Sequence, residues 1–189
     1  HTLLELSALG GRVSSAGGFV SWLRELIALR GTVSAQEVEG AARRQAEYLL
    51  DTGTVLVGDV SNIAASYTSL RGAGLYARIF HEAIGFQSER AQEIATLCRQ
   101  RLEGFPDTPR IVGAPSAHAP YSVSPDLFRR IGALARSRGS VTAVHLAESP
   151  EEDKFIRAGK GPFRELLEEM GVWDRAWTPF SCGPVAYVD

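Results

Sequence analysis

The sequence predicts an α/β fold in which strands and helices alternate around a mostly parallel sheet. Short apolar runs recur along the chain, and longer stretches with helical periodicity separate them. These runs do not alternate apolar with polar residues, which is typical of strands that are covered on both faces. The links between elements are short, as in a series of βαβ units. A chain of 189 residues can form one domain with a sizeable core.

Two helices and a strand are expected in the first third of the chain. An apolar stripe of helical spacing covers residues 19–29. Ser34 is a suitable N-cap, and Glu37 stands at the capping-box position of a long helix that extends to Leu50. The apolar residues 54–60 then predict a buried strand.

The same alternation continues along the rest of the chain. Strands are expected at 75–81, 110–114 and 141–145, and helices at 63–71, 88–103, 124–138, 151–157 and 162–170. Pro125 stands at the first position of one of these helices, where its fixed φ angle suits a helix start. Such a series forms either an open, doubly wound sheet or a (β/α) barrel.

The placement of polar residues favours the barrel. A single glycine, Gly58, stands near the end of the first full strand, where a dinucleotide-binding fold would have a glycine-rich phosphate loop. Polar residues instead stand where the expected strands end: Asp59, His81, Glu82, His118 and His145. A barrel gathers its active site at the carboxyl ends of its strands, so we expect these side chains to meet there.

Composition excludes several classes of partner. A formal net charge of −2 provides no basic surface for nucleic acid or anionic lipid. No apolar run approaches the ~18 residues of a membrane-spanning helix.

The cysteines indicate the cellular compartment. Cys98 and Cys182 form no ligand pair, and a chain of this size needs no disulfide framework, so a reduced, cytoplasmic protein is expected. The start at His1 has no basic segment typical of a signal peptide, and we expect the chain to begin within a longer gene.

His145 and Glu148 form the candidate catalytic pair. Histidine is a common neutral metal ligand. A divalent metal makes hydroxide available near neutral pH, and a carboxylate beside the water can transfer its proton to a leaving amine. The spacing H-x-x-E is common by chance, and any single histidine is more often a hydrogen-bonded core or surface residue, so the spacing needs further support.

The loop at 117–125 is a candidate substrate-binding element. Pro120 and Pro125 stiffen it, and His118 and Tyr121 offer hydrogen-bond donors, an arrangement that commonly holds substrate. The alternative is a plain capping loop in which Ser124 caps the next helix. Glu82, at the end of another expected strand, is a further candidate for substrate binding.

Several stretches resemble the amidohydrolase superfamily, in the group that contains cytosine, guanine, adenosine-type and aminofutalosine deaminases and the triazine chlorohydrolases. The matching segments are 1–7, 50–54, 80–85, 118–125, 145–149 and 159–163. The resemblance implies a metal-dependent hydrolase with a (β/α)8 TIM barrel, often accompanied by a small β-sandwich. About strands one to five lie in this chain, so residues 1–189 are expected to be a single partial barrel domain, without the sandwich and the last strands.

The resemblance also implies roles for individual residues. His1 and His145 would be ligands of one divalent metal, Zn or Fe. Glu148 would transfer protons between water and the leaving nitrogen, and His118 would contact the substrate. The family has a second histidine in its first motif, whereas Leu3 stands at that position here. The family's histidine on strand six and aspartate on strand eight also have no counterpart in this chain.

These features leave three interpretations open. The first is an enzyme that acts on carbon–nitrogen bonds other than peptide bonds, deaminating a heterocyclic or nucleoside-like small molecule. The second is a non-catalytic or truncated relative that binds a ligand or partner without a complete metal site, which Leu3 favours. The third is a hydrolase whose single metal is held by fewer ligands. Open sheet edges would invite pairing between copies of the chain, and hence a homo-oligomer.

Overall fold

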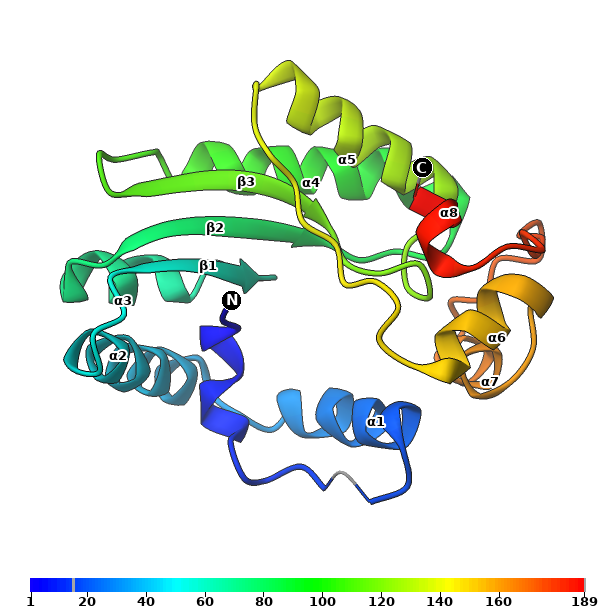
Figure 1. Ribbon diagram of the computed structural model, residues 1–189, viewed down its shortest axis with the longest axis horizontal. Helices are drawn as coiled ribbons and strands as arrows, with labels where there is room; N and C mark the ends of the chain where they lie inside the picture. The colour runs from blue at the N-terminus through cyan, green and yellow to red at the C-terminus, as the bar shows by residue number, and fades with distance from the viewer. Residues whose placement is uncertain (15, 189) are drawn as a thin grey trace.

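The computed structural model describes residues 1–14 and 16–188, and in these ranges three parallel strands form one sheet. The strands are β1 (Leu56–Ser61), β2 (Tyr76–Ala83) and β3 (Ile111–Ala117), paired in that order. In the register of the sheet, Ser61 lies opposite His81, and His81 lies opposite Pro115. The carboxyl ends of the strands therefore meet at one edge (Figure 1).

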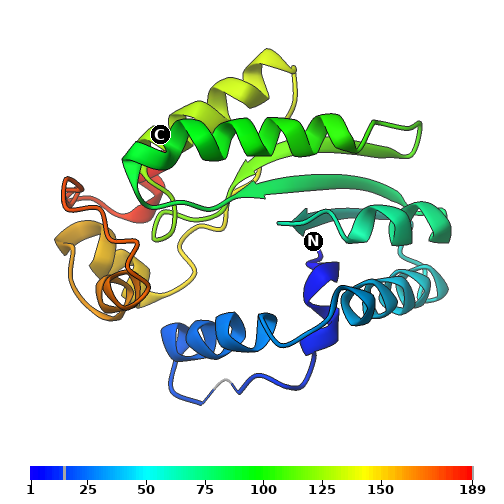
Figure 2. The same cartoon turned by 180° about the vertical axis from the view of Figure 1, so that it is seen from behind.

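Helices surround the sheet on both sides and beyond that edge. They are α1 (Phe19–Arg30), α2 (Ala35–Asp51), α3 (Ser66–Ala73), α4 (Ala91–Gly104), α5 (Pro125–Ser137), α6 (Pro150–Ala158), α7 (Pro162–Glu169) and α8 (Pro184–Val188), with short 3₁₀ helices η1 (Leu4–Leu9) and η2 (Ser88–Arg90). Helices α4 and α5 lie along β2 and β3, and α2 and α3 lie beside β1 (Figures 1 and 2). Helices α1, α6 and α7 lie towards the carboxyl ends of the strands.

The predicted starts of two helices are confirmed. At α2, the backbone N–H of Glu37 donates to Ser34 Oγ at 3.2 Å, and the backbone N–H of Ser34 donates to the Glu37 carboxylate at 2.9 Å. At α5, Pro125 follows the N-cap Ser124, whose Oγ accepts the N–H of Leu127 at 3.2 Å. Both caps satisfy amide groups that the helices leave without internal partners.

The prediction of a strand at 141–145 is wrong. The segment is extended and runs beside β3, but it forms no ladder with that strand. The two backbones meet where the N–H of His145 donates to the carbonyl of His118 at 2.7 Å. At another point of contact the donor is a side chain rather than a backbone amide: Thr142 Oγ1 donates to the carbonyl of Pro115 at 2.8 Å.

The start of the chain lies on the other side of β1. Thr2 forms a parallel bridge with Asp59, donating its N–H to Gly58 and accepting that of Val60, each at 2.9 Å. Residues near Thr2, the three strands and the 141–145 segment thus follow one another in the order expected for consecutive barrel strands. The arrangement is consistent with part of a barrel. Helix α8 was not expected from the sequence.

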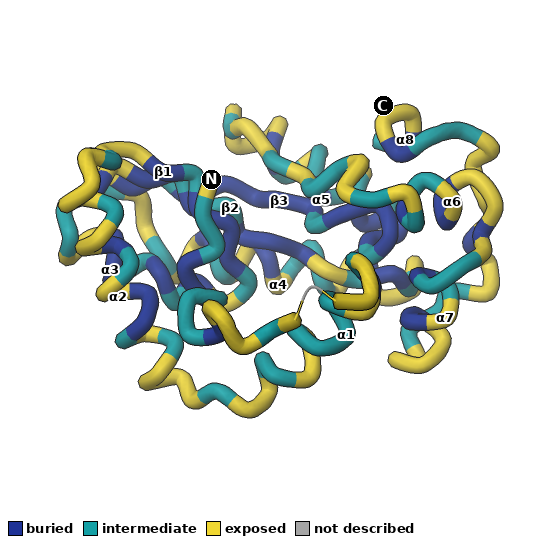
Figure 3. Tube along the Cα trace, turned by 60° about the horizontal axis from the view of Figure 1, so that its bottom comes forward, coloured by how far each residue is buried: buried dark blue, intermediate teal, exposed yellow. Residues whose placement is uncertain are grey.

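Among the residues that the structure describes, the buried side chains form three clusters. One cluster lies between the sheet and α2–α3 and includes Leu4, Leu70, Leu75, Ile79 and Ile111. A second lies between the sheet and α4–α5 and includes Cys98, Leu102, Leu127 and Ile131. The third lies around α6 and α7 and includes Phe86, Phe155, Phe163 and Trp177. Much of β2 and β3 is buried (Figure 3). No helix among the described residues is long and apolar enough to cross a membrane.

Candidate active site

A cavity of about 410 Å³ lies at the carboxyl ends of the strands. Its polar lining includes His1, Glu82, His118, Tyr121, His145 and Glu148. Its apolar side comes from α1, through Trp22 and Leu26, and from α7 and the residue after it, through Leu166 and Met170. A pocket of this size suits a small organic molecule that presents a polar edge to one side and an apolar part to the other.

Three side chains of the polar side lie close enough to share one ion. Glu82 at the end of β2, His118 after β3 and His145 at the end of the extended segment each offer one ligand atom, and these atoms lie within 4.8 Å of one another. Within this group, His145 Nε2 and Glu82 Oε1 lie 3.5 Å apart. Imidazole and carboxylate are a donor set that suits Zn and Fe.

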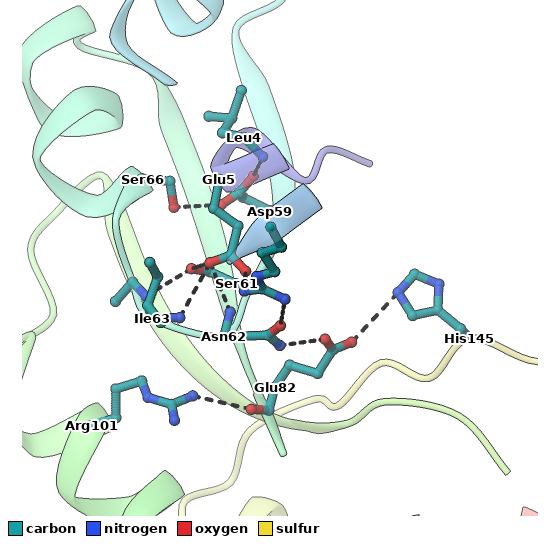
Figure 4. A network of polar contacts seen from close by, with 12 residues as sticks. Leu4, Glu5, Asp59, Ser61, Asn62, Ile63, Ser66, Glu82, Arg101 and His145 are labelled. Carbon is teal, nitrogen blue, oxygen red and sulfur yellow. Dashed lines mark hydrogen bonds and ion pairs between the residues drawn. The ribbon is translucent and has the colours of Figure 1, made fainter. Parts of the chain in front are cut away.

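Glu82 contributes a buried oxygen that accepts no hydrogen bond from the described residues. The side chain is 4% exposed, and its Oε2 accepts a hydrogen bond from Asn62 Nδ2 at 2.5 Å. Its Oε1 is buried without a hydrogen-bond partner and faces His145 (Figure 4). Burial raises the pKa of Glu82 to about 7. A buried acceptor without a donor is costly, and a bound cation would satisfy it. These residues therefore fit a metal.

His118 is suited to act as a neutral ligand. Its Nδ1 contacts the hydroxyl of Ser122, which leaves Nε2 available. Burial and, to a lesser extent, the neighbouring His145 lower the pKa of His118 to about 3. The ring is therefore neutral at physiological pH, the form in which histidine binds metals.

Glu148 lies beside the three-residue group. Its Oε1 is 3.7 Å from His145 Nδ1, and its Oε2 accepts a hydrogen bond from the Tyr121 hydroxyl at 2.6 Å. Ala147 has a φ angle of +57°, a left-handed conformation that is uncommon for residues other than glycine. This turn allows His145 and Glu148 to line the same cavity, and the buried Glu152 accepts the backbone N–H of Glu148 at 2.7 Å.

His1, Leu3 and Tyr121, the other residues that the sequence singled out at this site, also line the cavity. His1 lines the cavity, and its ring centroid is 5.9 Å from that of His145, but it is not part of the three-residue group. Leu3 lines the same cavity and has no lone pair to offer. Tyr121 is 3% exposed, and its ring stacks on Phe163 at 4.1 Å.

Two polar residues at strand ends do not reach the cavity, contrary to the expectation from their positions. His81 points away from Glu82, as alternate strand residues do, and packs against Phe105 at 6.1 Å between ring centroids. Burial, followed by the charge of Arg101, lowers its pKa to about 4. Asp59 is fully buried and accepts hydrogen bonds from the start of the chain, including the N–H of Leu4 at 3.0 Å.

Three further residues that line the cavity were not identified from the sequence as site residues. Asn62 contacts Glu82, Arg30 contacts Asn62, and Glu5 contacts both Arg30 and the backbone of Asn62. Glu5 lies in the segment 1–7 that resembles the family's first metal motif, where no role was assigned to it, and Asn62 stands just after a strand, a position that it shares with many loop residues. They come together because η1, α1 and β1 meet at the cavity.

Comparisons with known proteins find a matching family model and similar sequences. Residues 6–173 match the family model described as the amidohydrolase family. The aminodeoxyfutalosine deaminase of a Nitratiruptor species is 27% identical over 173 residues, which are 90% of this chain and 42% of that protein. The adenosine deaminase of Helicobacter pylori is 27% identical over 156 residues, 82% of this chain and 37% of that protein.

A solved structure with a similar fold is that of Helicobacter pylori aminofutalosine deaminase in complex with methylthio-coformycin. The TM-score is 0.78 at 26% sequence identity, and the match covers 89% of this chain and 41% of that chain. The chain therefore spans about two fifths of the length of the proteins it matches.

Proposed function

The chain belongs to the amidohydrolase family, and on that premise we propose that the protein removes an amino group from a heterocycle of the purine-nucleoside kind by hydrolysis. The relatives that support a deaminase are named for aminodeoxyfutalosine and adenosine. The observation that carries the proposal is the grouping of Glu82, His118 and His145 beside Glu148 in one cavity.

A divalent metal, Zn or Fe, would be held by Glu82, His118 and His145. Three protein ligands are typical of a catalytic zinc site. When bound, the metal supplies a Lewis acid that makes hydroxide available near neutral pH. The buried Oε1 of Glu82, which accepts no hydrogen bond from the described residues, supports this assignment. His1, to which the family resemblance gives a metal-binding role, lines the same cavity.

Glu148 would move the proton that the reaction requires. Water forms a C–O bond at the amino-bearing ring carbon, and the C–N bond to the amino group breaks. The Glu148 carboxylate takes a proton from water and delivers it to the leaving nitrogen, so that ammonia and an oxo-heterocycle are the products. Tyr121 supports this role by donating to one carboxylate oxygen of Glu148, which leaves the other oxygen, on the side of His145, for the proton.

The apolar side of the cavity would hold the part of the substrate that does not react. Trp22 and Leu26 of α1 lie opposite the polar group, together with Leu166 of α7. A nucleoside-sized molecule matches the cavity volume of about 410 Å³. The flat face of a purine ring would pack against these side chains while its amino group points to Glu148.

Metal analysis combined with ammonia release from adenosine tests the proposal. The purified protein should contain about one Zn or Fe per chain. Glu148→Gln should lower turnover by about 10²–10⁴-fold and keep the metal, because the change removes the proton acceptor but leaves the three-residue group intact. Glu165→Gln, at an exposed position of α7, is the matched control and should keep full activity. A metal-free protein whose activity a chelator does not change would refute the proposal.

Leu3 favours a second candidate function, a relative that binds a ligand without catalysis. Its side chain adds an apolar surface to the cavity at the position where the family has a histidine. Under this alternative, calorimetry should detect adenosine binding that is unchanged by chelator, with no ammonia release. Leu3→His should strengthen metal binding if position 3 is a ligand position, and unchanged affinity would show that it is not.

A further inference from the structure

The turn before α6 carries Glu148, the candidate acid/base. This turn, residues 146–149, leads from His145 to Pro150, the first residue of α6, and we name it the Glu148 turn (Figure 1). We propose that Glu152, in the first turn of α6, is a positioning residue that holds the Glu148 turn and so delivers the Glu148 carboxylate to the cavity. This inference rests on the proposed function, because it takes Glu148 as the group that moves the proton.

The Glu148 turn contains a conformation that its own sequence does not favour. Ala147 has a φ angle of +57°, in the left-handed region. A Cβ atom makes that region unfavourable, so a residue other than glycine stays there only where its surroundings hold it. The placement of Glu148 beside His145 therefore depends on contacts that the Glu148 turn makes with the rest of the fold.

Glu152 supplies such contacts from inside the protein. It has no exposed surface, and its Oε2 accepts the backbone N–H of Glu148 at 2.7 Å. In return, the backbone N–H of Glu152 donates to Ser149 Oγ at 3.2 Å. Burial raises the pKa of Glu152, and the backbone N–H groups of Glu148 and Ala147 oppose this shift. One carboxylate thus interacts with successive amides of the Glu148 turn.

The position of Glu152 differs from that of a glutamate that only caps a helix. Ser149 caps α6 through its Oγ, as Ser34 caps α2. In α2 the glutamate of the first turn, Glu37, is exposed and accepts the N–H of the cap residue itself at 2.9 Å. In α6 the corresponding Glu152 is buried and accepts the N–H of Glu148, the residue before the cap. Burying a carboxylate is costly, and a cap does not require it, so the Glu148 turn accounts for the burial of Glu152.

The acid/base is thereby held at both ends. Glu152 fixes the backbone of Glu148, and the Tyr121 hydroxyl donates to Oε2 of its carboxylate at 2.6 Å. The other oxygen, Oε1, lies 3.7 Å from His145 Nδ1. The Glu148 side chain is 25% exposed, so packing confines it only in part. A displacement of about 1 Å at a reacting group can lower a rate by about 10²-fold, and the backbone anchor therefore bears directly on turnover.

The second oxygen of Glu152 makes two conservative substitutions informative. Oε1 is buried and accepts no hydrogen bond from the described residues. Glutamine can therefore keep the contact to Glu148 through its amide oxygen, while its NH₂ group replaces an oxygen that binds no donor there. Aspartate keeps the charge, but it is one methylene shorter and its carboxylate no longer reaches the Glu148 N–H. The two variants separate the hydrogen bond from the charge.

Steady-state ammonia release from adenosine tests the proposal. Glu152→Ala should lower kcat by about 10²-fold, change KM by less than about threefold and keep the metal, because it displaces the acid/base alone. Glu152→Gln should stay within about threefold of full activity, whereas Glu152→Asp should lose kcat as Glu152→Ala does. Glu37→Ala removes the corresponding glutamate of α2, outside the cavity, and should keep full activity. If Glu152→Ala does not fold, the comparison of Glu152→Asp with Glu152→Gln carries the test.

Amide hydrogen exchange of the Glu148 turn gives a readout that does not depend on activity. Exchange at residues 147–149 should be faster in Glu152→Ala than in the unmodified protein, and unchanged in Glu152→Gln and Glu37→Ala. Unchanged exchange or unchanged kcat in Glu152→Ala would overturn the positioning role while the proposed function stands. A loss confined to KM, or loss of the metal, would overturn it as well.

The Glu148→Gln background shows whether Glu152 acts through Glu148. If it does, adding Glu152→Ala should lower the residual turnover by less than about twofold, and a full further loss would overturn the proposal. Absence of ammonia release by the unmodified protein would overturn the proposed function, and the positioning role of Glu152 with it.

Discussion

Replacing Tyr121 by phenylalanine removes one hydrogen bond to the candidate acid/base and leaves the ring in place. The hydroxyl donates to Glu148 at 2.6 Å, and the ring stacks on Phe163 at 4.1 Å. A hydrogen bond to a charged group contributes about 1.5–3 kcal/mol. The Glu148 side chain is 25% exposed, so water replaces part of this contribution. A loss near the lower limit, about 1.4 kcal/mol, corresponds to a roughly tenfold lower kcat/KM.

Steady-state ammonia release from adenosine, together with thermal unfolding, measures this effect. Tyr187→Phe is the matched control, because the Tyr187 hydroxyl donates to the carbonyl of Val123 at 3.0 Å and lies outside the cavity. Both variants lose one buried hydroxyl, but only Tyr121→Phe should lose kcat/KM. Equal activity losses in the two variants, or full activity of Tyr121→Phe, would refute the view that Tyr121 positions Glu148.

Three further predictions concern the fold. Burial raises the pKa of Cys98 to about 11. At pH 8, a thiol reagent should therefore modify Cys182 alone in the folded protein, and both cysteines once guanidinium has unfolded it. Equal modification rates of the two cysteines in the folded protein would contradict this prediction. Phe155→Ala, at a position with no exposed surface, should lower the free energy of unfolding by about 3–5 kcal/mol in urea titrations, and a change under about 1 kcal/mol would show that the site is loosely packed. Ser34→Ala should lower it by about 1 kcal/mol through loss of the cap of α2, and an unchanged value would show that the capping box is not stabilising.

Helix starts could be predicted because their signals are local. Ser34 and Glu37 lie three residues apart, and their reciprocal hydrogen bonds depend on little else. The strands were predicted within a few residues of β1, β2 and β3, since their apolar runs are distinctive. The segment 141–145 is an apolar run of the same kind. Its contact with β3, however, depends on which backbone hydrogen-bonding groups of β3 are left without a partner, and only the assembled sheet determines this.

The candidate site was predictable to the extent that its residues stand at strand ends. His118 and His145 were identified in this way, and Glu148 was identified by its H-x-x-E spacing from His145. The structure brings all three into one cavity. Successive side chains of β2 point to opposite faces of the sheet, so only one of the neighbours His81 and Glu82 could reach the cavity. A strand's end can be read from its sequence, but the face on which a given residue lies depends on the pairing register.

The sequence by itself determined the α/β class, the helix starts, the resemblance to the amidohydrolase family and the pair His145 and Glu148. These depend on composition, short-range spacing and motif order. Only the tertiary structure decided that Glu82 lies beside the two histidines, and that Asn62, itself in contact with Arg30, donates to it. The physical reason is distance along the chain: these contacts span tens of residues, and no local pattern specifies them until the strands pair and α1 packs across their ends.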